Sequence, residues 1–265
     1  MIVTNLHKEP VALDTVLHRD LRLKNELNAI PKLAPFTSFI VSVSEFADAS
    51  LTFPILFVRA APDALGKDTV APVAVFGLKP GENLFATEDG KWDASYVPAM
   101  LRAYPFTMAR IEGSDRWAMV FDNTWEGMSR TEGLPLFNEK GEATELLNGV
   151  HKFVQDLETD LERTRQACAA LLEMKLLKPM RFDATLQNGE QLSVDGFMTA
   201  DEEAIAKLPD AQLAQMYRNG LLGLIQIHIT SLNNMRRLLD RRIIQQGVAS
   251  RAAAAGAAND GAAQA

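Results

Sequence analysis

Short apolar runs dominate the first half of the chain. Residues 39–43, 53–58, 73–78 and 116–121 are nearly continuous in apolar and β-branched side chains. Runs of roughly four to eight such residues, bounded by turn-forming residues, are typical of buried strands. The pattern therefore predicts a mainly antiparallel sheet over about residues 37–122, with short connections.

The second half of the chain changes to a helical period. Apolar residues recur at spacings of three and four from Leu146 to Leu172, which predicts one long amphipathic helix that ends before Pro179. A shorter helix is expected earlier in the chain, over residues 95–103, with Ser95 as its N-cap.

The clearest local signal is an Asn-Gly pair. Asn188-Gly189 separates two segments of alternating polarity, so residues 182–194 are predicted to form a β-hairpin with a two-residue type I′ turn. C-terminal helices follow at 201–207, with Thr199 as a cap, at 210–218, and from 221 to about 245.

This order of elements predicts an α+β fold. A single domain is expected over residues 1–246, with a sheet-rich half at 37–142 and a helix-rich half at 143–246. Residues 247–265 are almost free of large apolar side chains and cannot bury enough surface to order themselves. A disordered tail is predicted there.

Composition limits the classes of partner. Apolar residues make up 47% of the chain and charged residues 23%, as in ordinary globular proteins. A net charge of −7 argues against a nucleic-acid partner, which requires clustered positive charge. The single cysteine, Cys168, excludes an intramolecular disulfide and a cysteine-rich zinc site, and it is expected to be a packing residue of the long helix.

The chain also lacks the marks of export. Its N-terminus has no basic start, apolar stretch or small-residue cleavage site, and no window of 18 residues qualifies as a transmembrane segment. A cytoplasmic protein is expected.

Catalytic signatures are missing as well. The four histidines are far apart in the sequence, and there is no nucleophile elbow, P-loop or dinucleotide fingerprint. We therefore expect no metal and no cofactor, and catalytic residues remain unknown. His228 is expected to be a core or interface histidine because isoleucines and a leucine surround it in the sequence.

The last predicted helix ends in a group of arginines. Two interpretations are open: a basic contact face for acidic partners or phosphates, and a solvated helix end that the helix dipole favours. The residues are Arg236, Arg237, Arg241 and Arg242.

Unusual side chains concentrate between residues 83 and 106. Rigid aromatic rings beside an arginine suit recognition of a small organic acid or a peptide, by stacking and bidentate hydrogen bonding. Alternatively, the rings form the hub of the core. The candidate ligand-binding residues are Asn83, Trp92, Tyr96, Arg102, Tyr104 and Asp122.

The same segment contains four short pieces in order: Asn83-Leu84-Phe85, Gly90-Lys91-Trp92, Tyr96-Val97-Pro98-Ala99 and Arg102-Ala103-Tyr104-Pro105-Phe106. In this order they resemble the hallmark block of SapC-like proteins, in which an NLF … GxW … YxPAxxRxYPF order recurs. The likeness extends over roughly residues 5–245 and includes Glu45-Phe46. Ala103 departs from the family, which often has a second arginine there, so a paired-arginine clamp is not required.

The resemblance implies a bacterial protein of a family named after a surface-layer (S-layer) secretion locus, with relatives near outer-membrane nutrient-uptake genes. No catalytic residue is carried over from it. The leading hypothesis is a cytoplasmic, non-enzymatic accessory protein that serves one of these processes. It would bind a small molecule or a protein partner through residues 92–106.

Two further hypotheses stay open. One is an enzyme of unrecognised type that joins Arg102 and Tyr104 to carboxylates. The other is a homo-oligomer formed through the long helix or the last helix. The carboxylates considered are Asp93, Asp122 and Glu126.

Overall fold

The computed structural model describes residues 6–24, 36–87, 91–111, 113, 116–186 and 189–247. The predicted tail, from residue 248 onward, lies outside the described residues.

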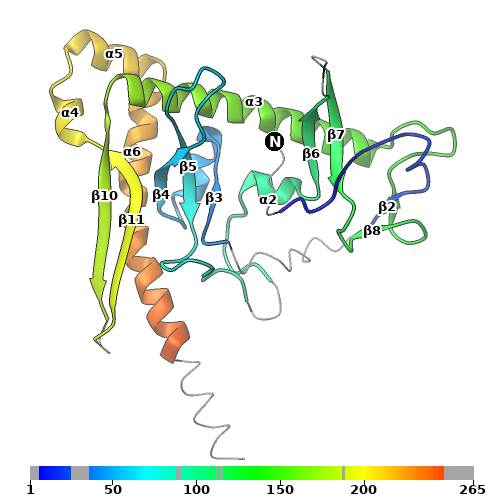
Figure 1. Cartoon of the computed structure of the whole chain (residues 1–265), viewed down its shortest axis with the longest axis horizontal. Coiled ribbons are helices and arrows are strands. Elements are labelled where there is room, and N and C mark those ends of the chain that lie inside the picture. The colour runs from blue at the N-terminus through cyan, green and yellow to red at the C-terminus, as the bar shows by residue number, and fades with distance from the viewer. Residues whose placement is uncertain are drawn as a thin grey trace, which may run out of the picture.

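A five-stranded antiparallel sheet forms the larger part of the fold (Figure 1). The predicted hairpin supplies two of its strands, so segments more than 100 residues apart in the sequence pair side by side. In spatial order the strands are β10 (Leu177–Thr185), β11 (Gln191–Ala200), β4 (Ile55–Ala60), β5 (Thr69–Val75) and β3 (Ser38–Ile40).

Two three-stranded sheets complete the β structure. The first has the order β1 (Pro10–Ala12), β7 (Trp117–Asp122) and β6 (Phe106–Arg110). The second has the order β8 (Met128–Ser129), β2 (Arg22–Leu23) and β9 (Leu134–Pro135). The strands expected over 37–122 are thus divided between separate sheets, and the α+β class is confirmed.

The long helix predicted over the second half is α3 (Glu145–Glu173). Thr144 caps it by accepting a hydrogen bond from the Leu147 amide at 3.4 Å. Figure 1 shows α3 running across one end of the five-stranded sheet and on past β6 and β7. It therefore links the two halves of the fold.

The expected helix at 95–103 is shorter than its pattern suggested. Helix α2 (Ala99–Ala103) begins after Pro98, and the Ser95 hydroxyl contacts Thr52 Oγ1 at 3.0 Å instead of capping a helix. It lies near η1 (Val43–Glu45) and α1 (Phe46–Ala49), to which a buried carboxylate connects it.

The C-terminal helices agree closely with the prediction. They are α4 (Glu202–Ala206), α5 (Asp210–Arg218), α6 (Leu221–Ser231) and a further helical segment at 234–247. The last predicted helix is interrupted at residues 232–233. Asp201, not Thr199, caps α4, because its side chain accepts from the Glu203 and Ala204 amides.

The predicted hairpin forms from β10 and β11. Leu186 N donates to Glu190 O at 2.8 Å, and Gly189 N donates to Leu186 O at 2.9 Å. Gly189 has φ 82°, a left-handed conformation that favours glycine. The predicted type I′ turn has Asn188 as a central residue, and Asn188 lies outside the described residues.

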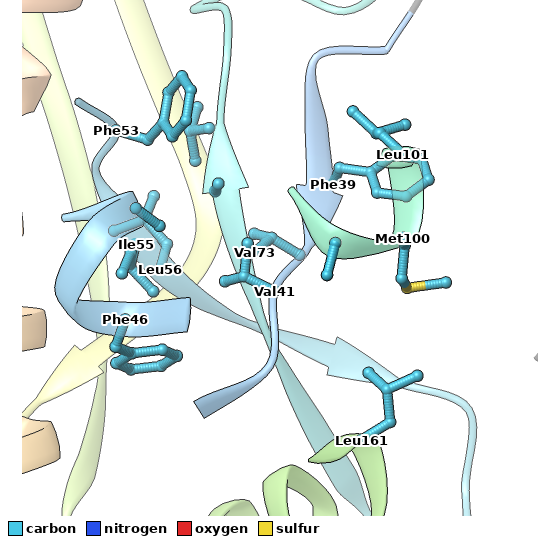
Figure 2. Packing of buried hydrophobic residues seen from close by; sticks show 14 of the residues in the cluster. Phe39, Val41, Phe46, Phe53, Ile55, Leu56, Val73, Met100, Leu101 and Leu161 are labelled. Atoms are coloured by element: carbon cyan, nitrogen blue, oxygen red, sulfur yellow. The ribbon is translucent and has the colours of Figure 1, made fainter. Parts of the chain in front are cut away.

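Buried apolar side chains from strands and helices in both the sheet-rich and the helix-rich part of the chain form one cluster. Figure 2 shows Phe39 of β3, Val73 of β5, Phe46 of α1, Leu101 of α2 and Leu161 of α3 contributing to it. Each fully buried side chain of this size contributes about 1.5–3 kcal/mol. The cluster fixes the positions of α2 and of the segment that leads into it.

A buried polar network docks α6 on the large sheet. His228 Nε2 accepts a hydrogen bond from the Ala200 amide at 3.1 Å, so the proton is on Nδ1, which donates to Ile55 O at 2.8 Å. The Thr199 hydroxyl also contacts Nε2 at 2.9 Å, which explains why Thr199 is not a helix cap. The expected role of His228 in the core is confirmed, since its exposed fraction is 0%.

Candidate functional site

Trp92 belongs to an aromatic cluster at the edge of the core. Its ring centroid lies 5.1 Å from that of Phe76, 5.9 Å from that of Phe85 and 6.0 Å from that of Phe53. The indole N–H donates to Tyr96 O at 2.8 Å. Trp92 is half-buried, and its contacts with these three rings and with Tyr96 are made within the chain.

Tyr96 bonds to a buried carboxylate, Glu45. The tyrosine hydroxyl and the Ala99 amide donate to Glu45 Oε1 at 2.7 and 2.6 Å. The Ser42 amide and hydroxyl donate to Glu45 Oε2 at 2.8 and 2.9 Å. Burial and the hydrogen bond to Glu45 raise the pKa of Tyr96 well above its usual value.

Sequence reasoning named Glu45 only as part of the family resemblance. A signal for its role exists, because Ser42 and Glu45 have the three-residue spacing of a capping box, and both capping bonds form. The same carboxylate also binds the first amide of α2, which lies 54 residues further along the chain. That second contact has no local signal.

Tyr104 and Asp122 form a separate group. Asp122 is 0% exposed and accepts five hydrogen bonds from the chain: from the Lys8, Glu9 and Thr124 amides and from the hydroxyls of Thr124 and Tyr104. Burial alone would raise the pKa of Asp122, but these donors outweigh it and hold the pKa at about 2. Burial and the bond to Asp122 raise the pKa of Tyr104.

Arg102 is exposed, unlike Trp92, Tyr96 and Tyr104. Its guanidinium carbon lies 5.3 Å from the ring centroid of Phe153 on α3 and 5.8 Å from that of Tyr96. Its Nε donates to Val97 O at 3.1 Å. Among the described residues no carboxylate lies within ion-pair distance of this cation.

The remaining candidates lie elsewhere. Asn83 Oδ1 accepts from the Phe85 amide at 3.0 Å, Asp93 pairs with Arg241, and Glu126 is exposed. Arg102 therefore contacts Tyr96 and Phe153, whereas Tyr104 contacts Asp122. The structure does not bring Arg102 and Tyr104 together with a shared carboxylate.

Two hollows are lined by described residues at a distance from this segment or beneath it. One, of about 10 Å³, lies beside α3 and has His7, Thr107 and Glu158 in its wall; it has room for one water. The other is an open depression of about 530 Å³ beside residues 16–20. Within the described ranges no three His, Cys, Asp or Glu side chains are placed to hold a metal ion.

The described helices also include none that combines the length and apolar character needed to cross a bilayer. Fold and site together define an α+β protein whose aromatic segment is mostly bonded internally and directs one arginine outward.

The chain belongs to the SapC family, whose model matches residues 13–238. This confirms the resemblance noted in the sequence. Comparison with curated proteins gives no significant match, and comparison with solved structures gives none either.

Proposed function

We propose that this protein is a bacterial, cytoplasmic, non-enzymatic accessory protein that binds an acidic group of a protein partner through the Arg102 face. We define this face as Arg102 with the two rings beneath it, Tyr96 and Phe153. Membership of the SapC family supports a role in surface-layer export or nutrient uptake.

One observation carries the proposal: an exposed guanidinium lies over two aromatic rings and has no carboxylate partner in the described chain. Contact with the rings limits the side-chain conformations of Arg102, so less entropy is lost on binding. Nε donates to Val97 O, and the side chain also interacts with the Tyr96 hydroxyl, so the plane of the guanidinium is held in place with its terminal nitrogens at the exposed end of the side chain. The planar guanidinium fork matches the two oxygens of a carboxylate.

The exposure of Arg102 favours a protein over a small molecule. Small ligands bind in concave sites that bury most of their surface, whereas the Arg102 side chain is exposed. Tyr96 and Phe153 are half-buried, so each adds apolar surface next to the charge. An acidic side chain with an apolar neighbour on a partner protein fits this combination.

The test is photo-crosslinking in cells of the source bacterium. A benzoylphenylalanine placed at position 156, which is exposed and three residues from Phe153 on α3, reports on whatever covers the Arg102 face. Arg236, an exposed arginine of the segment 234–247, provides the matched control.

A discrete crosslinked protein is expected with the native chain and with R236E. We expect R102E to lower its yield by about tenfold or more, because the charge is reversed at the recognition point. R102K should retain part of the yield, since it keeps the charge but loses the fork. An unchanged crosslink in R102E would refute the proposal.

A further inference from the structure

Two short segments before α2 pair side by side, and we call them the two arms. One arm contains residues 84–87 and the other residues 91–93, and Ala86 pairs with Trp92 in an antiparallel bridge. Thr87 N donates to Lys91 O at 2.9 Å, and Asp93 N donates to Phe85 O at 2.7 Å. Trp92, which bonds to Tyr96, therefore depends on the two arms staying together.

Arg241, in the helical segment 234–247, bridges these arms. Its Nε donates to Leu84 O of the first arm at 2.6 Å, and its Nη2 donates to Asp93 O of the second arm at 3.1 Å. It also pairs with the Asp93 carboxylate, and its guanidinium carbon lies 4.5 Å from the Phe85 ring centroid. Gln245 adds a bond to Leu84 O at 3.0 Å.

The neighbouring arginine anchors the same helix at a second place. Arg242 is 4% exposed and pairs with Glu82, and its Nη2 lies 3.4 Å from Glu190 of the hairpin. Both interpretations from the sequence therefore fail for these two arginines, which bind the chain itself. Arg242 is too deeply buried for a clean test, whereas the Arg241 side chain is 29% exposed.

We infer that Arg241 is a positioning residue for the Arg102 face. It holds the two arms closed on Trp92, the indole N–H fixes the backbone of Tyr96, and the Tyr96 ring supports the Arg102 guanidinium. The C-terminal helical segment thus sets the geometry of a surface to which Tyr96 and Arg102, more than 130 residues earlier in the chain, contribute. This inference rests on the proposed function.

The first test needs no partner. Hydrogen exchange is measured on the whole chain for R241A, R241K and the control R236A. In R241A the bonds from Arg241 to the two arms are lost, which should speed exchange of the Thr87 and Asp93 amides by about tenfold. This is the change that one or two lost hydrogen bonds produce. Amides of β4 and β5 should keep their native rates, and R241K should give an intermediate effect because it cannot bond to both arms.

Two further readouts separate positioning from general loss of stability. In a W117F/W125F background, Trp92 is the only remaining tryptophan, and its emission should shift to longer wavelength in R241A. The crosslink at position 156 should fall by about threefold or more in R241A although Arg102 is intact.

The outcomes distinguish this inference from the proposed function. Native exchange and emission in R241A would overturn the positioning role. Faster exchange with an undiminished crosslink would overturn the link to the Arg102 face. An R102E variant that crosslinks normally would instead refute the proposed function, while the exchange rates would still decide whether Arg241 holds Trp92.

Discussion

Acidification from about pH 7 to about pH 4.5 is expected to destabilise the folded protein through one buried imidazole, His228. The neutral ring is fixed by three bonds: Nδ1–H donates to Ile55 O, and Nε2 accepts from Ala200 N and contacts the Thr199 hydroxyl. A proton on Nε2 would face the Ala200 amide and break this arrangement. The charged form is therefore strongly disfavoured in the folded chain.

The magnitude follows from the shift in pKa. Burial lowers the pKa of His228 from 6.5 to about 4, and the bond to Ile55 only partly opposes this. Because the folded pKa is depressed, the unfolded chain binds the proton first. The stabilisation is complete above about pH 6.5 and is lost as the pH falls toward 4, to a limit of about 3 kcal/mol.

Urea denaturation at several pH values measures this loss directly, with the free energy of unfolding as the readout. H228N provides the comparison, because its amide N–H can replace the donor to Ile55 O but the side chain does not titrate. We expect H228N to be less stable at neutral pH by about 1–3 kcal/mol, since donors near Nε2 lose their acceptor. Its stability should then change little between pH 6.5 and 4.5, and equal pH slopes for H228N and the native chain would refute the reasoning.

Two further predictions concern stability. D122N should lower the free energy of unfolding, measured by urea denaturation, by about 2–4 kcal/mol because five donors face its carboxylate. In the native chain the stabilisation by Asp122 should disappear as the pH falls from about 4 toward 2. The exposed control E126Q should change the free energy of unfolding by no more than about 0.5 kcal/mol. G149A, on an open face of α3, should stabilise the protein by up to about 1 kcal/mol. G77A should destabilise it by about 1–3 kcal/mol because its Cβ would lie 2.2 Å from Glu82 O. A melting temperature higher in G77A than in G149A would contradict the account.

Local patterns predicted the elements that depend on local order. The period of apolar residues identified α3, and alternation around an Asn-Gly pair identified the β10–β11 hairpin. Strand β6 (Phe106–Arg110) was not predicted, because it follows Pro105 directly and mixes Thr, Met, Ala and Arg. Its pairing with β7 establishes it as a strand.

The candidate site could be predicted only in composition. Aromatic residues and an arginine were recognised as a group, but their bonding partners lie far away in the sequence. The segment contacts Glu45 and Arg241, which are distant in the sequence. Its neighbour Asp122 accepts bonds from the equally distant backbone of Lys8 and Glu9. No periodicity encodes such contacts, so the sequence did not separate Arg102, which faces outward, from Tyr104, which bonds to Asp122.

The central claim is that Arg102 offers its guanidinium to an acidic group. NMR of the arginine Nε–H signals tests it most directly, in a titration of the whole chain with acetyl-glutamate amide and, separately, acetyl-glutamine amide. We expect the Arg102 signal, assigned by its absence in R102K, to shift with the glutamate compound alone, while that of Arg236 stays in place. Equal shifts with both compounds, or a stationary Arg102 signal, would contradict the account.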